Sequence, residues 1–161
     1  GDNSVLLQSN GRVVACGGNS EGQLNVPELA EGEVYTAISS GGDHTVLLKS
    51  NGRVVACGGN MAGQLNIPEL AESEVYTSIS AGGYHTVLLK SSGSVVACGC
   101  NVHGQLNIPE LADGEIYTAI SAGADHTMML KSNGRVVACG NNDAGQLNVP
   151  DLPDGEIYTK M

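Results

Sequence analysis

Short apolar runs separated by polar turns recur along the whole chain. In residues 43–83 the first run covers 46–48, the turn Ser-Asn-Gly-Arg covers 50–53, and a second run covers 54–57. Asn-Gly between two apolar runs predicts a tight hairpin, with a type I′ turn that places both central residues at positive φ. A third run at 75–80 precedes a Gly-Gly turn. The pattern therefore predicts three short strands.

The same pattern returns with a period of 41 residues. We divide the single repeat domain 1–161 into four copies, namely 2–42, 43–83, 84–124 and a shortened 125–161. Self-similarity at a fixed period of this length is typical of repeat architectures, in which one unit buries its apolar faces only against its neighbours.

The apolar runs are continuous rather than alternating, which favours strands that are buried on both faces. No segment shows a helical period over ten or more residues, and Pro68 excludes residues 67–70 from a central strand. We therefore expect an all-β fold, a β-propeller of four short antiparallel three-stranded blades in which each copy folds as one sheet.

Three arrangements of the four blades stay open. The first is a partial propeller, or an arc of a larger ring, in a chain that is a fragment. The second is a closed four-bladed ring, in which residues 156–159 complete the blade begun by residues 4–8. The third is an oligomer whose chains share blades.

Charge and composition narrow the classes of partner. The chain has 17 acidic and 7 basic side chains and a formal net charge of −10, which argues against direct nucleic-acid binding and against anionic membranes. No apolar run approaches about 18 residues, and no signal peptide is visible. Five cysteines without a short-spaced framework favour a reducing, intracellular location, cytoplasmic or nuclear.

Histidines and cysteines recur at the repeat period and could suggest metal chemistry. Equivalent atoms of neighbouring blades lie on the order of 10 Å apart, whereas zinc ligands converge to about 2 Å from the metal. We therefore expect His44, His85 and His126 to hydrogen-bond between blades. The same spacing exceeds the Cα separation of about 7 Å that a disulfide allows, so the periodic cysteines are predicted to be small buried residues: Cys16, Cys57, Cys98 and Cys139. A redox or metal role for Cys98 with Cys100 is an alternative.

Acidic residues also repeat, and stacked copies would place them in an arc. The arc either keeps a repeat array soluble or steers a basic partner. Its members are Glu28, Glu31, Glu33, Glu69, Glu72, Glu74, Glu110, Asp113, Glu115, Asp151, Asp154 and Glu156. Identical repeats give rings of identical groups, whereas active sites need different groups at one point. We therefore predict no catalytic, cofactor-binding or metal-binding residues.

Function is then expected where the copies differ. One set of variable residues lies in the loop before Gly-Gln-Leu, and the other precedes the repeated His-Thr; the partner-binding candidates are Glu21, Met61, Val102, His103, Asp143, Asp43, Tyr84 and Asp125. Tyr84 is the strongest candidate, because tyrosine is enriched in binding hot spots. The alternative is that these residues are unconstrained loop tips.

The repeated string HTVLLKSNGRVVACGGNMAGQLN at 44–66 resembles the regulator of chromosome condensation repeat. The resemblance rests on Asn-x-x-Gly-Gln-Leu at 19–24, 60–65, 101–106 and 142–147, and on Ile-Ser-Ala-Gly followed by His. It implies a seven-bladed propeller in complete members, and the short copy is similar to the compact type with three-stranded blades seen in the propeller-type β-lactamase inhibitory protein. Cys57-Gly58 replaces a frequent Trp-Gly, and Asn66 replaces a frequent Gly, which indicates a divergent lineage.

The function that follows is a non-enzymatic protein–protein interaction module or scaffold with a protein partner, for which the charge favours a basic one. The resemblance also implies alternatives: guanine-nucleotide exchange on a small GTPase, an accessory propeller of a ubiquitin ligase, or inhibition of an enzyme. Self-association to complete a ring is a further alternative. Because the chain has no tryptophan, a light-sensing role of the kind found in this family is excluded.

Overall fold

The computed structural model describes all 161 residues and contains eleven β-strands and no helix. It therefore holds no helix that could span a membrane. The strands are β1 (Asn3–Leu7), β2 (Val13–Gly17), β3 (Tyr35–Ser40), β4 (His44–Lys49), β5 (Val54–Gly58), β6 (Tyr76–Ala81), β7 (His85–Lys90), β8 (Val95–Gly99), β9 (Tyr117–Ala122), β10 (His126–Lys131) and β11 (Val136–Gly140).

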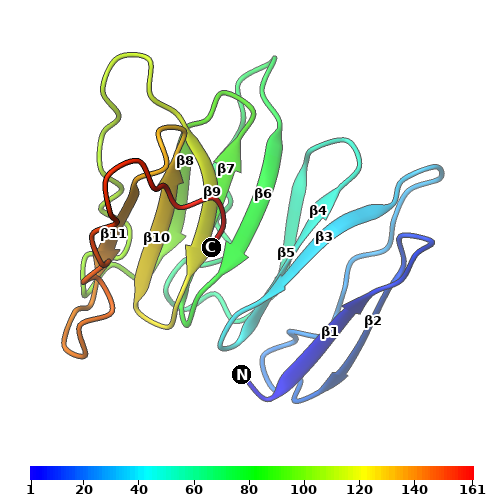
Figure 1. Cartoon of the computed structure of the whole chain (residues 1–161). Coiled ribbons are helices and arrows are strands. Elements are labelled where there is room, and N and C mark those ends of the chain that lie inside the picture. Colours follow the sequence, from blue (N-terminus) through cyan, green and yellow to red (C-terminus); the bar gives the residue numbers. More distant parts are fainter.

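The strands form four antiparallel sheets that stand side by side in an open row (Figure 1). The first sheet is β1-β2, and the other three have the orders β3-β4-β5, β6-β7-β8 and β9-β10-β11. The prediction of an all-β propeller made of short antiparallel blades is confirmed.

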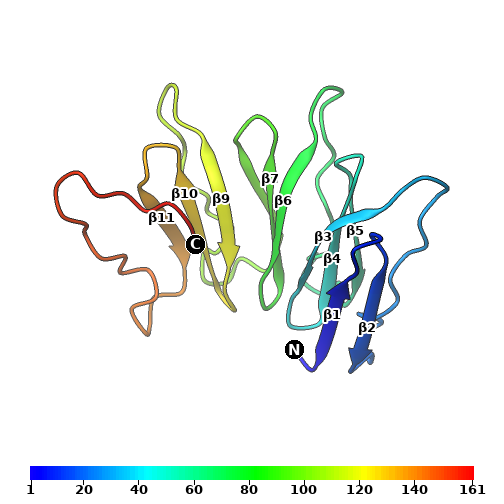
Figure 2. The ribbon, with the colours of Figure 1, turned by 45° about the vertical axis from the view of Figure 1, so that its right-hand side comes forward.

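The row does not close into a four-bladed ring. The first and last sheets lie at opposite ends of it (Figures 1 and 2), and residues 156–159 form no strand. The backbone N–H of Tyr158 instead donates to the carbonyl of Gly134, which holds this segment on the last sheet. The arrangement is a partial propeller.

Each three-stranded sheet combines strands of two copies, so the expectation that one copy forms one sheet is wrong. In the second sheet, β3 comes from copy 2–42, while β4 and β5 come from copy 43–83. The short turn at 41–43 brings β3 and β4 together as antiparallel neighbours, whereas the long connection 59–75 carries the chain on to the next sheet. The first copy accordingly contributes only two strands to the first sheet.

The hairpins lie where Asn-Gly predicts them, but their turn type differs from the expected type I′. In the β4–β5 hairpin the N–H of Gly52 donates to the carbonyl of Lys49, and Gly52 has a φ of 74°. No residue other than glycine has positive φ, so Asn51 is not left-handed. This geometry fits a type I turn followed by a left-handed glycine, the common three-residue hairpin loop. The Oδ1 atom of Asn51 accepts the N–H of Arg53 at 3.0 Å and fixes the turn.

Burial of both sheet faces explains the continuous apolar runs. All of residues 44–48 in β4 are buried, because a sheet covers each side. Leu47 and Leu88 are 0% exposed, whereas Leu6 at the same repeat position in the first sheet is 58% exposed. Both sheet faces therefore become core only where neighbouring sheets cover them.

A tyrosine fastens each long connection to the segment that follows it, and Tyr35, Tyr76 and Tyr117 are buried. The hydroxyl of Tyr76, at the start of β6, donates to the carbonyl of Pro68 at 2.7 Å. The pair recurs in every copy, through Tyr35, Tyr117 and Tyr158. Proline thus has a structural role in a segment that cannot be a central strand.

Candidate partner-binding surface

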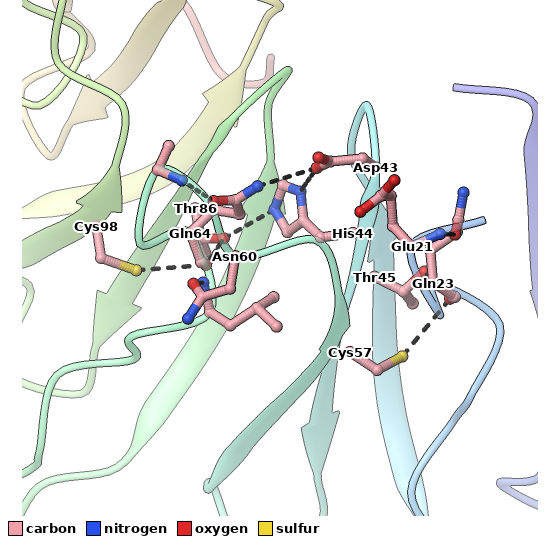
Figure 3. A network of polar contacts seen from close by, with 12 residues as sticks. Glu21, Gln23, Asp43, His44, Thr45, Cys57, Asn60, Gln64, Thr86 and Cys98 are labelled. Carbon is pink, nitrogen blue, oxygen red and sulfur yellow. Dashed lines mark hydrogen bonds and ion pairs between the residues drawn. The ribbon is translucent and has the colours of Figure 1, made fainter. Parts of the chain in front are cut away.

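Adjacent sheets are joined by a buried polar network that recurs along the row. The hydroxyl of Thr86 donates to the carbonyl of Gln64 at 2.8 Å, and His44 Nε2 lies 2.9 Å from the same hydroxyl oxygen (Figure 3). Because the hydroxyl has one proton, which it donates to Gln64, His44 must donate from Nε2. His85 and Thr127 repeat the contact at 3.0 Å. The prediction of hydrogen bonds between blades is confirmed for His44 and His85, whereas His126 on the last sheet makes no such contact.

These histidines are neutral at neutral pH. Burial lowers the pKa of His44, although Asp43 raises it. Burial and the neighbouring His44 lower the pKa of His85 to about 4. A histidine with this pKa acts as a fixed hydrogen-bond donor and does not gain a proton near pH 7.

The periodic cysteines contact the same carbonyl groups. The Sγ atoms of Cys57, Cys98 and Cys139 lie 3.5, 3.6 and 3.4 Å from the carbonyl oxygens of Gln residues in the preceding loops. All five thiols are free, and burial raises the pKa of Cys98 to about 11. Cys57, Cys98 and Cys139 are half-buried and Cys16 on the first sheet is exposed, so the prediction of buried cysteines holds only in part. A thiol with a raised pKa is a poor nucleophile and a poor metal ligand.

The two sets of variable residues meet at one end of the sheets. The N–H of Gly59 donates to the carbonyl of Asp43 at 2.9 Å. Gln64 Nε2 donates to Asp43 Oδ1 at 3.0 Å (Figure 3). The loop after β5 therefore lies against the turn before β4. We call this surface the loop end; it comprises the turns 41–43, 82–84 and 123–125 and the loops 18–22, 59–63, 100–104 and 141–145.

The turns of the loop end form a row across neighbouring sheets. The N–H of Gly42 donates to the carbonyl of Gly83 at 3.1 Å, and the N–H of Gly83 donates to the carbonyl of Ala124 at 3.0 Å. The next residue in each turn is variable, so Asp43, Tyr84 and Asp125 stand in a row along the loop end. We call these three residues the Asp–Tyr–Asp row.

Three of the partner-binding candidates have apolar or aromatic side chains and are nevertheless exposed to solvent. Met61 is 99% exposed, Val102 is 83% exposed and Tyr84 is 53% exposed. The remaining loop candidates, Glu21, His103 and Asp143, are exposed as well, whereas Asp43 and Asp125 are half-buried. The loop end thus presents apolar side chains among carboxylates.

One further residue of the loop end was not predicted from the sequence. Gln105 is 0% exposed, and its Oε1 accepts the N–H of His103 at 3.0 Å, but its Nε2 has no hydrogen-bond partner. The equivalent amide of Gln64 donates to Asp43, and that of Gln146 donates to Asn141. In the third copy Tyr84 and Cys100 occupy the positions of those two acceptors. The sequence shows that Tyr84 stands where the second copy has Asp43. It does not show that this Asp contacts a glutamine 21 residues away.

We expect an exchange of these two residues to move stability in opposite directions. Tyr84→Asp gives the buried Gln105 amide an acceptor and should raise the free energy of unfolding by about 1 kcal/mol. Asp43→Tyr deprives Gln64 of its acceptor and should lower it by about 1–2 kcal/mol. Urea unfolding of both variants measures the effect, and a shift of both in the same direction would contradict this account.

The acidic arc lies at the opposite end of the sheets. Its third member in each of three copies pairs with the lysine at the end of a strand, in Glu33–Lys49 at 2.8 Å, Glu74–Lys90 at 3.0 Å and Glu115–Lys131 at 2.7 Å. The hydrogen bond from Lys49 lowers the pKa of Glu33. These three carboxylates therefore form ion pairs within the chain.

Comparison with known proteins gives a family and a fold. The sequence pattern of the regulator of chromosome condensation (RCC1) repeat matches residues 30–64, 76–105 and 112–146. No curated protein matches the sequence of the chain.

Similar solved structures are about twice as long as this chain. Prp20p from Saccharomyces cerevisiae, described with its binding to Gsp1p and histones, has a TM-score of 0.75 at 22% identity, over 95% of this chain and 45% of that one. The ectodomain of the Physcomitrella patens receptor kinase CR4 gives 0.73 at 22% identity, over 98% and 42%. Human WBSCR16 gives 0.74 at 16% identity, over 99% and 49%.

At these identities the structures show the fold alone, and the chain spans about half the length of each of them. The repeat match covers more than half of the chain, and it agrees with the sheets seen here. The chain belongs to the regulator of chromosome condensation (RCC1) repeat family.

Proposed function

We propose that this chain is a non-enzymatic protein-interaction module and that the loop end is its contact surface. The observation that carries the proposal is the gathering of the variable side chains at one end of the sheets. Among them Met61, Val102 and Tyr84 are apolar or aromatic and exposed.

Within each copy the residues that hold the sheets together differ from those exposed in the loops, and this supports the proposal. The repeated His, Thr, Tyr and Cys side chains are engaged in contacts that hold the sheets together. The loops are free to vary, and a rigid scaffold that carries variable loops is a common basis for recognition. Exposed apolar patches mark interaction sites, and tyrosine is enriched in interface hot spots. Equivalent polar groups stand in separate blades instead of converging on one point, which argues against catalysis.

Protein partners also agree with the neighbouring structures. Prp20p is described as binding Gsp1p and histones, and another structure holds Kap60 bound to it. For this chain a basic protein is the proposed partner, because a net charge of −10 steers cationic surfaces toward it. Exchange on a small GTPase, a ubiquitin-ligase accessory role and enzyme inhibition remain alternatives, and self-association to complete a ring stays a prediction. An intracellular location also stays a prediction, which the five free thiols support.

The proposal is tested by affinity capture from cell lysate followed by mass spectrometry. The test variant combines Met61→Ser, Tyr84→Ser and Val102→Ser at the loop end. The matched control combines Glu31→Gln and Glu72→Gln at the opposite end. We expect the control to retain the proteins captured by the parent chain and the loop-end variant to lose them at least tenfold. Equal capture by both variants would place the contact surface elsewhere.

A further inference from the structure

We propose that the Asp–Tyr–Asp row, together with Gln105, binds a basic peptide segment of the partner. An arginine side chain of the segment lies over the ring of Tyr84 between Asp43 and Asp125, and a backbone carbonyl of the segment accepts the free N–H of Gln105. This inference rests on the proposed function, because it names the chemistry that the loop end recognises.

The unpaired amide of Gln105 indicates that the partner supplies a hydrogen-bond acceptor. Its Oε1 already accepts the N–H of His103, so turning the amide over would place a donor against a donor. The buried Nε2 therefore keeps a proton that no group of the chain accepts. A buried donor left unpaired costs about 1–3 kcal/mol, and a partner that supplies an acceptor recovers this cost. Tyr84 stands at the position of the Asp that serves Gln64 and is half exposed, and the proposed binding requires its side chain to turn and admit the acceptor.

The surrounding charge selects a neutral acceptor. Asp43 and Asp125 flank position 84 in the adjacent turns, and Asp143 lies in the loop of the next copy. A carboxylate brought to Gln105 would be repelled by these groups, whereas a backbone carbonyl would not. The peptide backbone of a partner therefore fits this position better than an acidic side chain.

The same carboxylates attract a cation to the ring of Tyr84. A guanidinium over an aromatic face is attracted by the ring, and nearby carboxylates add charge-assisted hydrogen bonds. Asp125 makes no ion pair within the chain, and Asp43 uses one oxygen for Gln64. Lys49, Lys90 and Lys131 are paired at the opposite end of the sheets, so they do not compete for the row. Arginine suits the site better than lysine because its planar group can stack and hydrogen-bond at once.

The experiment titrates the ¹⁵N-labelled chain with an acetylated, amidated peptide of alternating glycine and arginine. A second peptide carries citrulline in place of arginine, which keeps the carbonyl groups and removes the charge. We expect the arginine peptide to shift the side-chain amide signals of Gln105 and to leave those of Gln146, which is paired with Asn141 outside the row, in place. The citrulline peptide and the variant Tyr84→Ala should each weaken binding at least tenfold, whereas Tyr84→Phe should retain it.

Three results would overturn the inference: equal binding of the two peptides, unchanged binding to the Tyr84→Ala variant, or equal shifts for Gln146 and Gln105. Melting curves of the variants show that they are folded, which is expected because Tyr84 is exposed. If the arginine peptide does not bind, while the loop-end variant still loses its partners in affinity capture, only the proposed arginine site is wrong. If both fail, the proposed function is wrong as well.

Discussion

Leu88→Ala is expected to lower the free energy of unfolding by about 3 kcal/mol, the largest effect of a single substitution proposed here. Leu88 is 0% exposed in β7 and belongs to the core cluster with Val46 and Ile79. Removing its side chain therefore loses buried apolar surface and leaves a cavity between two sheets, which cannot collapse without moving both. Urea unfolding followed by circular dichroism measures the change.

The chain provides a matched control at the same repeat position. Leu6 has the same neighbours in sequence but lies on the uncovered face of the first sheet, with 58% of its surface exposed. Leu6→Ala should cost less than about 1 kcal/mol. Similar losses for both variants would mean that stacking of the sheets does not supply the stability.

Acid is expected to destabilise the fold before its carboxylates are protonated. His85 has a pKa of about 4 in the folded chain, compared with an ordinary value of 6.5. Between these values the unfolded chain binds a proton that the folded chain does not, so stability falls as the pH falls from 6.5 to 4. After allowance for solvent screening, the loss from this residue is roughly 2 kcal/mol, and His44 acts in the same direction.

Two variants separate this effect from general acid denaturation. His85→Asn introduces the residue that the first copy carries at this position, Asn3, and should flatten the dependence of stability on pH between 6.5 and 4. His103→Asn changes an exposed loop histidine and should leave the dependence unchanged. The lowered pKa of Glu33 acts in a more acidic range, because its stabilising effect is lost only below the ordinary carboxyl value of 4.5. An unaltered slope in the His85→Asn variant would contradict the assignment.

Local signals in the sequence located most of the secondary structure. The apolar runs became strands, and the Asn-Gly and Ser-Gly turns became hairpins, because both depend on residues that are close in the chain. The turn type was missed because Gly52 alone takes positive φ, and a type I turn with a left-handed glycine serves the same two strands. The sequence did not show which three strands form one sheet, because the boundary of a repeat can be placed anywhere along its period. Only the hydrogen-bonded pairing shows that β3 joins β4.

The candidate surface was predicted in part. Variation among the copies identified Met61, Tyr84 and Val102, and the structure shows that their loops and turns share one end of the sheets. Variation could not identify Gln105, which is present in every copy as part of Gly-Gln-Leu. Gln105 differs in its surroundings, since Tyr84 and Cys100 replace the acceptors that serve Gln64 and Gln146.

The sequence by itself determined that this chain is a β-rich repeat protein of the RCC1 type, because strand runs, turns and a 41-residue period are properties of neighbouring residues. The tertiary structure decided which strands form a sheet, which histidine nitrogen donates, and which glutamine keeps an unpaired amide. The histidine and glutamine contacts join groups that are 42 and 21 residues apart in the chain, and such contacts arise only when the sheets pack against one another. The pairing of β3 with β4 is local, but it crosses the boundary between two copies of the repeat.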